Sequence, residues 1–384
     1  MISLKQEITP KIFIILLAIF FGSSILSYAF WPASSGLISP QGDLADSPTI
    51  DPSEPKTEVC PLNGGLYTKT EKALWEQRRP LTAMIENHSE SRPQSGLNKA
   101  DIVYEAIAEG GITRFLAVYY CDAAFGDLTI GPVRSARTYY LDWASEYSLY
   151  PLYLHVGGGN TPNKADALGQ IVDYGWSGEN DLNQFGLSVK ECAREYSRTG
   201  ESRATEHTMY CYTEALWKLA DVRGWAAVDE DGDSWEDSYT SWEFAKKPLT
   251  GADSATSVTF DFWDDFSQYT VNWHYDSDKG AYLRKNGGKD QLDFTTGQNL
   301  SATTVITQFV TETGPIDELK HILYGTIDDG KALAFTQGQV QELTWEKTKR
   351  TARTIFYDED DDEYQFQPGK IWIEILPKGN TVDY

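Results

Sequence analysis

Basic residues are scarce in this chain, in which 57 Asp and Glu outnumber 33 Lys and Arg and the formal net charge is −24. A protein that binds DNA or RNA neutralises phosphates with Lys and Arg, so this balance argues against a nucleic-acid partner. It also disfavours broad adhesion to anionic lipid, which attracts clusters of basic residues. We therefore predict no nucleic-acid partner.

The chain also lacks the short motifs that identify common enzyme classes. GxSxG, HExxH, CxxC and a complete Walker loop are all missing. The acidic tract 229–237 imitates the start of a calcium loop, but Ser234 and Thr240 occupy positions that require Gly and Glu. We interpret this tract and the acidic tract 358–363 as solvated turns. The sequence therefore predicts no metal and no cofactor, and it leaves open whether the protein is an enzyme.

Charge is absent from one N-terminal run, residues 12–31, whose length of about twenty residues suffices for one membrane-spanning helix. Lys5 and Lys11 precede it and place residues 1–11 in the cytoplasm under the positive-inside rule. A cleaved signal peptide with its site at 27–29 is the alternative, and we favour an uncleaved anchor because the run exceeds a typical signal core. No Cys lies near the end of the run, so the sequence offers no lipoprotein attachment site. We expect a single-pass protein of the cell membrane with its ectodomain on the extracytoplasmic side.

A polar segment and then the cysteines follow this run. Residues 32–59 are rich in Pro, Ser, Asp and Glu, and this composition predicts a disordered linker. The four cysteines come after it, and an even number in an oxidising compartment indicates two disulfides. Three pairings are open, and we favour Cys60 with Cys121 and Cys192 with Cys211, which joins neighbours along the chain.

Length and composition predict two folded units of class α+β. The 384 residues exceed one typical domain, and 41% hydrophobic residues supply ample core material. Residues 60–225 mix β-rich runs with helical patterns and predict a mixed α/β N-terminal domain. In residues 240–380, short runs of period two alternate with turn residues and predict an antiparallel β-rich C-terminal domain.

A β-hairpin is expected where the runs 101–109 and 112–120 flank a Gly-Gly pair, because Gly accepts the positive φ of a tight primed turn. In this register Glu105 and Glu109 share one face of the hairpin. Arg114 lies across the turn and can face one of these carboxylates. The hairpin therefore supplies candidate acids and one candidate anion-binding residue.

Two further predicted strands end in polar residues. The run 81–87 reads as a strand that carries Glu86 and Asn87 into a polar loop. The run 152–159 reads as a buried strand that contains His155 and ends in a loop of three glycines, and we expect a helix from about Pro162. A histidine inside a strand is more often a satisfied core residue than a catalyst, and both interpretations stay open.

Arg134 and Arg137 precede a predicted helix at 138–147, which contains Asp142. Two guanidinium groups near a helix N-terminus suit a phosphate or a carboxylate. The alternative is that both arginines pair with carboxylates of the protein and brace the fold. We predict that Arg134 and Arg137 share one cleft with Glu105 or Glu109.

Several ordered blocks of the sequence resemble one known family. The blocks are RPLTAMIEN (79–87), RPQSGL (92–97), KADIVYE (99–105), EGGITR (109–114), GPVRSAR (131–137) and HVGG (155–158). They are similar to the DUF3048 (YerB-like) family of bacterial envelope proteins, and with the C-terminal half the resemblance covers about residues 79–377. It implies an exported, membrane-tethered protein with an α+β N-terminal part and a β-rich C-terminal part. The family carries no established activity, so the resemblance assigns no catalytic residue.

Two functions fit these observations. The first is a membrane-anchored extracytoplasmic protein that binds an envelope glycan, an anionic polymer or a membrane protein. The second is an envelope enzyme acting on a phosphorylated or glycosidic substrate, which requires its acids and arginines to line one open polar cleft. The candidate acids are Glu86, Glu105, Glu109 and Asp142, and the candidate ligand-binding residues are Arg114, Arg134, Arg137, Asn87 and His155.

Overall fold

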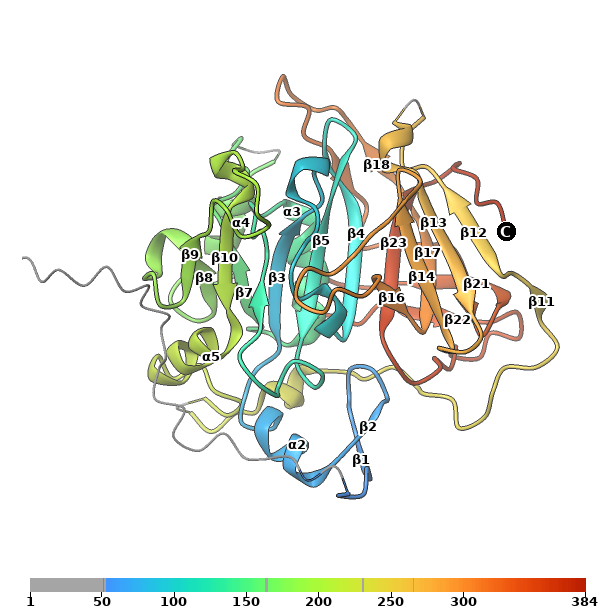
Figure 1. Ribbon diagram of the computed structural model, residues 1–384, viewed down its shortest axis with the longest axis horizontal. Helices are drawn as coiled ribbons and strands as arrows, with labels where there is room; N and C mark the ends of the chain where they lie inside the picture. The colour runs from blue at the N-terminus through green and yellow to red at the C-terminus, as the bar shows by residue number, and fades with distance from the viewer. Residues whose placement is uncertain (1–50, 52, 163–164, 230, 265) are drawn as a thin grey trace, which may run out of the picture. The chain divides into compact units, whose positions relative to one another are not determined.

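The computed structural model describes residues 51, 53–162, 165–229, 231–264 and 266–384 (Figure 1). The expected cytoplasmic tail, the expected anchor and most of the expected linker lie outside these residues. No helix within the described ranges is long and apolar enough to cross a membrane. Short helices are combined with many strands, which confirms the predicted α+β class.

One sheet of eleven strands dominates the described chain (Figure 1). Most residues of its inner strands are buried, as expected for strands that are covered on both faces. In sheet order the strands are β11 (Asp253–Ser254), β21 (Gln339–Glu346), β20 (Asp329–Thr336), β17 (Thr304–Val310), β23 (Ile371–Pro377), β4 (Ile102–Glu109), β5 (Ile112–Tyr119), β3 (Leu81–Glu86), β7 (Leu152–His155) and β8 (Asp181–Asn183), and β22 (Ile355–Tyr357) pairs with β21.

Smaller sheets and short helices complete the fold. The second sheet contains β12 (Ser257–Phe260), β13 (Val271–Asp276), β14 (Ala281–Asn286) and β15 (Lys289–Asp290), with β16 (Ser301–Ala302) on β14. The remaining strands are β6 (Thr129–Ile130), β10 (Met209–Tyr212) and β9 (Cys192–Arg194) in one sheet, β1 (Glu58–Val59) with β2 (Leu66–Tyr67), and β18 (Glu312–Thr313) with β19 (Leu323–Tyr324). The α-helices of the described residues are α2 (Lys69–Trp75), α3 (Thr138–Ala144), α4 (Ala167–Asp173) and α5 (Thr213–Val222). Short 3-10 turns are η1 (Ser89–Ser91), η2 (Leu97–Lys99), η3 (Ser145–Tyr147), η4 (Gln184–Gly186), η5 (Thr205–His207), η6 (Trp235–Ser238) and η7 (Ser267–Tyr269).

Strand β23 joins the two predicted segments into one sheet. It runs parallel to β17 on one side and parallel to β4 on the other, with Ile371 opposite both Thr304 and Ile102. The expectation of a purely antiparallel C-terminal domain is therefore wrong at β23. Parallel neighbours need a long crossover, and the chain between β17 and β23 supplies one.

The predicted hairpin is confirmed, with β4 and β5 antiparallel and Gly110 and Gly111 at φ of 57° and 80°. The register shifts between Ile107 and Glu109, which marks a β-bulge. Glu105 contacts Thr113, whereas Glu109 contacts the next residue of β5, Arg114. Successive residues of a strand point to opposite faces, so the bulge has moved Glu109 to the face opposite Glu105. The prediction that both carboxylates share one face is wrong for this reason.

Two predicted boundaries also differ from the structure. The helix expected from about Pro162 begins at Ala167, where the Asp166 side chain accepts the Gly169 N–H and caps the first turn. The expected linker reaches to residue 59, but Glu58 already pairs with Tyr67 in the β1–β2 ladder. The predicted helix at 138–147 is confirmed as α3 followed by η3.

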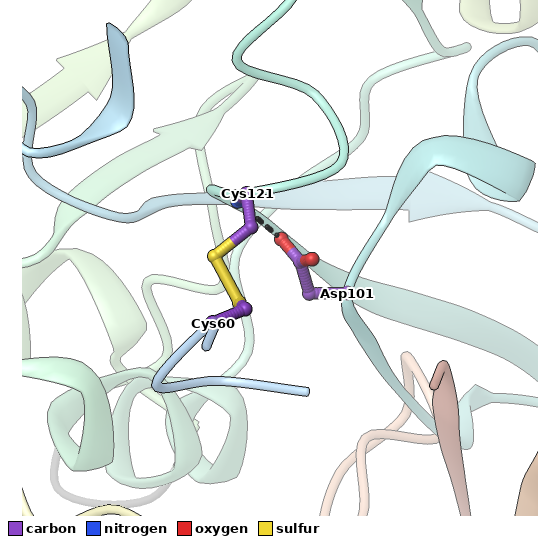
Figure 2. A group of neighbouring side chains, drawn as sticks. All are labelled: Cys60, Asp101 and Cys121. Carbon is purple, nitrogen blue, oxygen red and sulfur yellow. Dashed lines mark hydrogen bonds between the residues drawn. A yellow bond between two sulfur atoms is a disulfide. The ribbon is translucent and has the colours of Figure 1, made fainter. Parts of the chain in front are cut away.

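Both predicted disulfides are present. Cys60 is bonded to Cys121 and Cys192 to Cys211, and the second pair lies directly opposite in the β9–β10 ladder. Figure 2 shows the first disulfide beside the carboxylate of Asp101. This buried carboxylate accepts the backbone N–H groups of Tyr120 at 2.7 Å and Cys121 at 3.0 Å, and burial raises its pKa to about 7.

The tryptophans of the described chain form core rather than surface. Trp263 is half-buried, and every other described Trp is at most 7% exposed. Stacked aromatic surfaces are one way to bind sugars, but these rings are used for packing. The buried tryptophans are Trp75, Trp143, Trp176, Trp217, Trp225, Trp235, Trp242, Trp273, Trp345 and Trp372.

Candidate functional site

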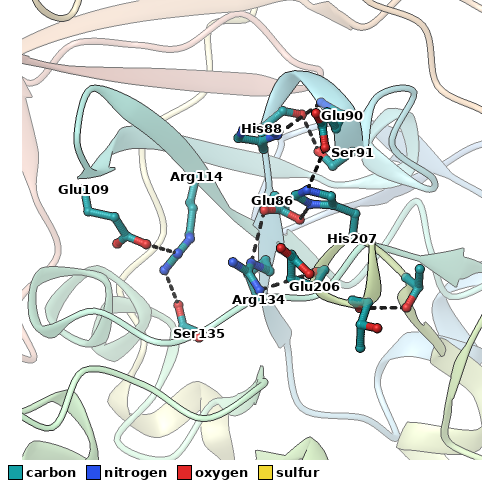
Figure 3. A network of polar contacts seen from close by, with 12 residues as sticks. Glu86, His88, Glu90, Ser91, Glu109, Arg114, Arg134, Ser135, Glu206 and His207 are labelled. Carbon is teal, nitrogen blue, oxygen red and sulfur yellow. Dashed lines mark hydrogen bonds and ion pairs between the residues drawn. The ribbon is translucent and has the colours of Figure 1, made fainter. Parts of the chain in front are cut away.

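Charged side chains gather where β3 and β5 lie beside the loop that precedes α3 (Figure 3). Glu86 is the last residue of β3 and lies opposite Arg114 in the β3–β5 ladder. The loop runs along the same strand end, because the Arg134 N–H donates to the Met84 carbonyl at 2.8 Å. Backbone pairing therefore places the Arg134 and Arg114 side chains near Glu86, although they are distant in sequence.

Glu109 holds two of the predicted arginines. Its carboxylate lies 2.5 Å from Arg114 Nη2 and accepts the Arg137 Nε–H at 2.9 Å. The arginine side chains are 5% and 9% exposed, and that of Glu109 is 29% exposed. Burial alone would raise the pKa of the Glu109 carboxyl, but the charges of both arginines outweigh burial and lower it to about 2. Glu109 is therefore a permanently ionised counterion at neutral pH.

Glu86 anchors a second group that includes the third predicted arginine. Arg134 Nε lies 3.1 Å from one Glu86 oxygen, and His207 Nδ1 lies 2.8 Å from the other. The pKa of His207 is raised, chiefly by its hydrogen bond with Glu86. Arg134 also donates to the Glu206 carbonyl at 3.4 Å. With its side chain 24% exposed, Arg134 is the most accessible of the three predicted arginines.

Glu105 and Asn87 lie inside the protein, apart from these arginines. The Asn87 amide donates to Glu105 at 3.0 Å and to the Thr113 hydroxyl at 2.8 Å. Glu105 is also ion-paired with Arg284 of β14, and neither side chain of the pair has any exposed surface. The structure thus brings Arg114 and Arg137 together with Glu109, but it assigns Glu105 to a buried network.

The last two predicted site residues, His155 and Asp142, also have hydrogen-bond partners within the protein. His155 is buried, and its ring nitrogens lie 2.6 Å from the Gly157 carbonyl and 2.7 Å from Asp181. Asp142 accepts hydrogen bonds from Tyr174 at 2.7 Å and Thr326 at 2.5 Å. These contacts match the interpretation of His155 as a satisfied core residue.

Sequence reasoning missed Arg284 and His207. Arg284 is 179 residues from Glu105, and His207 is 121 residues from Glu86. No local pattern links such distant positions. The one available signal is chemical, because fully buried carboxylates such as Glu105 need a cation or several donors.

Beside this site lies an open groove of about 410 Å³, which we call the amide groove. It lies between the loop that follows β3 and the β14–β15 hairpin, so both predicted segments line it. The residues that define it are Arg92, Gln268, Asn286, Lys289, Asp290 and Gln291.

Asn286 is the unusual residue of the amide groove. Asn286 is only 3% exposed, yet neither the nitrogen nor the oxygen of its side-chain amide has a hydrogen-bond partner in the described chain. By contrast, the Gln291 amide donates to Asn87 at 3.0 Å and to Gln94 at 3.1 Å. Buried polar groups are almost always paired, so an unpaired amide in a groove indicates a position for a ligand or an ordered water.

Two family models match this chain. The N-terminal domain of DUF3048, a protein of unknown function, matches residues 65–226, and the C-terminal domain of DUF3048 matches residues 258–373. The chain therefore belongs to the DUF3048 family, as its sequence blocks predicted.

Particular relatives agree with this assignment. "Putative lipoprotein YerB" of Bacillus subtilis (strain 168) is 30% identical over 328 residues, which cover 85% of this chain and 88% of the relative. The crystal structure of YerB from Bacillus subtilis has a TM-score of 0.68 to this chain at 25% identity, over 85% of this chain and 100% of the other. The similarity spans both family segments, so the joined architecture is shared along nearly the whole relative.

Proposed function

We propose that this protein is a membrane-tethered extracytoplasmic binding protein that holds an anionic glycan of the cell envelope in the amide groove. Three observations support the proposed location, namely the apolar run at 12–31, the two disulfides and the relative named as a lipoprotein. Disulfides persist in oxidising compartments, outside the cytoplasm.

The candidate acids favour binding over acid–base catalysis. A general acid at neutral pH needs a raised pKa and contact with substrate. Glu109 has a pKa lowered to about 2, and Glu105 has no exposed surface and is paired with Arg284. Glu86 is held between Arg134 and His207. The bulge in β4 also separates Glu105 from Glu109, so these acids do not line one cleft.

The unpaired amide of Asn286 is the observation that carries the glycan proposal. Burying an amide without a partner costs about 1–3 kcal/mol, and a ligand that supplies both a donor and an acceptor recovers this loss. Neighbouring hydroxyl groups of a sugar supply such a pair. Gln268 adds a further amide to the groove wall.

The charge of the groove favours an anionic ligand. Arg92 and Lys289 both line it, on a chain whose net charge is −24. Asp290 is the one acid among its lining residues, and Lys285 lies 3.7 Å from it. Arg92 lies over the Tyr269 ring at 5.2 Å and donates to Asn87, and burial lowers its pKa to about 10, so it stays charged at neutral pH.

The test measures binding of the purified full-length chain to size-fractionated envelope polysaccharide of the source organism by calorimetry. The same polysaccharide with its carboxyl groups chemically reduced is the neutral probe. Asn286→Leu is expected to weaken binding to both probes about 10-fold, which corresponds to one lost hydrogen bond. Lys289→Ala is expected to weaken binding to the anionic probe alone.

Lys279→Ala is the matched control, because Lys279 is exposed on the neighbouring hairpin turn and lies outside the groove. It should bind both probes as the wild type does. Equal affinities of the wild type and Asn286→Leu would overturn the proposal. Shortening of the polysaccharide during incubation would favour the enzyme alternative instead.

A further inference from the structure

The two ring nitrogens of His207 lie close to two different carboxylates (Figure 3). Nδ1 lies 2.8 Å from Glu86, and Nε2 lies 3.5 Å from Glu90. When the Nδ1–H donates to Glu86, the neutral ring presents an Nε2 lone pair to the Glu90 oxygen. Two acceptors repel each other, so a proton or a metal ion is needed between them.

His88 brings a second imidazole to this place. Its ring is stacked on that of His207, with centroids 4.9 Å apart and planes 13° apart. His88, Glu90 and His207 each offer one ligand atom, and these atoms all lie within 4.8 Å of one another. Ligand atoms around a tetrahedral zinc ion, with bonds of about 2.0–2.2 Å, are roughly 3.4 Å apart, so the three need only to move closer.

We propose that His88, Glu90 and His207 bind one divalent transition-metal ion of the zinc type. Imidazole nitrogens with a carboxylate oxygen suit zinc better than magnesium or calcium, which prefer oxygen ligands alone. Three protein ligands leave a further coordination position for water or for a ligand atom.

The required movements are small and fall on accessible side chains. The Glu90 side chain is 70% exposed, and His88 is only half-buried. The His88 ring turns out of its stack and gives up a hydrogen bond of 3.2 Å that its Nδ1 accepts from the Glu90 N–H. His207 is already in position, because it is nearly buried and held by Glu86.

Glu86 is a positioning residue in this proposal. Histidines that bind metals commonly donate their other ring N–H to a carboxylate, which fixes the tautomer and the ring orientation. Glu86 does so at 2.8 Å and is itself held by Arg134 at 3.1 Å. The charges agree with this role, because the three carboxylates of Glu86, Glu90 and Glu206 outnumber the two guanidinium groups nearby, those of Arg134 and Arg92, and favour a bound cation.

Another group of possible ligand residues in the described chain does not qualify. Cys60, Asp101 and Cys121 also lie close together, but the two sulfurs are joined in a disulfide (Figure 2). Asp101 is occupied by backbone N–H groups. Because Glu90 and His207 are far apart along the chain, no local pattern of the sequence indicates this group.

The test uses the full-length chain, stripped with EDTA and titrated with Zn²⁺ at about pH 8 against a chromophoric chelator. We expect one Zn²⁺ per chain, and a Co²⁺ absorption band characteristic of nitrogen and oxygen ligands. His207→Ala should weaken Zn²⁺ binding at least about 100-fold, and Glu86→Gln and Glu90→Gln about 10–100-fold. His274→Ala is the matched control, because His274 is an exposed histidine on β13 and should leave binding unchanged.

Glu90→Gln guards against misfolding, because this exposed residue can be changed without altering the unfolding temperature of the metal-free chain. Failure of the wild type to bind Zn²⁺ would overturn the proposal and assign a proton to the position between His207 and Glu90. Wild-type affinity in Glu90→Gln and His207→Ala would overturn it as well. The glycan proposal is tested separately, because Asn286→Leu leaves all three ligands in place.

Discussion

Arg284 and Glu105 form a fully buried ion pair between β14 of the second sheet and β4 of the eleven-stranded sheet. The two residues are 179 positions apart and belong to the two matched family segments. Glu374 of β23 lies opposite Glu105 in the parallel ladder. The Arg284 guanidinium therefore pairs with Glu105, beside the buried carboxyl group of Glu374, and connects the segments.

Replacing Arg284 with Met should destabilise the protein by about 3–5 kcal/mol, because it leaves Glu105 buried without its counterion. Urea unfolding followed by tryptophan fluorescence measures this loss. Arg223→Met, at an exposed position, should cost less than about 0.5 kcal/mol and serves as the control. A loss below about 1 kcal/mol for Arg284→Met would show that the pair is not needed for stability.

Glu374→Gln should remove a loss of stability that the wild type shows as pH rises above about 4.5. Burial, and then the charge of Glu105, raise the pKa of Glu374 well above its usual value, so folding favours the protonated form of this carboxyl. A carboxyl group whose pKa is higher in the folded protein stabilises the folded state fully at pH values below its unfolded pKa of about 4.5. This stabilisation is lost as pH rises through the pKa of the group in the folded protein.

The free energy of unfolding of the wild type should therefore fall by up to about 1.4 kcal/mol per pH unit above pH 4.5 because of Glu374. The free energy of unfolding of Glu374→Gln should not show this fall. Free energies of unfolding at pH 5 and pH 8 provide the measurement. The variant should resemble the wild type at pH 5 and exceed its stability at pH 8. Parallel pH profiles for the two proteins would refute the protonated Glu374.

Glu109 should give stability the opposite pH dependence, with a loss of stability in acid. Arg114 and Arg137 lower its pKa to about 2, so its stabilisation is present above pH 4.5 and is lost as pH falls through about 2. The full loss is about 3 kcal/mol. Glu109→Gln should be less stable by about this amount at pH 7, and its difference from the wild type should vanish near pH 2. A constant difference across this range would count against the prediction.

The two disulfides should contribute unequally to stability. Cys60–Cys121 closes a loop with a sequence separation of 61, and Cys192–Cys211 one of 19. On the chain-entropy account, removal should cost about 4 kcal/mol for the first and about 3 kcal/mol for the second. Paired Cys→Ser variants measured in urea test this order. A larger loss for Cys192→Ser with Cys211→Ser would reverse it.

Asn286→Leu should maintain or raise stability, by up to about 1–3 kcal/mol, while it weakens ligand binding. The change removes a buried amide that has no partner in the described chain and keeps the branching of the side chain at Cγ. Thermal and urea unfolding of the unliganded chain measure the effect. A destabilised variant would indicate that ordered water already satisfies the amide, and that Asn286 serves the fold.

The predictions that succeeded rest on neighbours along the chain. The Gly110–Gly111 pair specifies its tight turn by backbone conformation alone, and α3 follows its helical pattern. The disulfides join cysteines that are adjacent in sequence order. Asp358 accepts the N–H groups of Asp360 and Asp362, so the acidic tract forms a turn, as expected.

The site was predicted only in part. The pairing of Arg114 and Arg137 with Glu109 follows from one hairpin and the loop beside it. The bulge near Ile107 could not be read from the sequence, because nothing local distinguishes a shifted register from a regular one. Because of that shift, the Glu105 side chain lies in the interior and the Glu109 side chain lies beside the arginines.

By itself the sequence determined the family, the α+β class, the charge balance and the local turns, since each depends on composition or on residues a few positions apart. Tertiary structure decided which charged residues form ion pairs, because only the parallel placement of β23 and the docking of β14 bring Arg284 to Glu105. It likewise placed His207 beside Glu86 and Glu90. Ion pairs and ligand clusters depend on distances in space, and the chain's order along the sequence does not encode them locally.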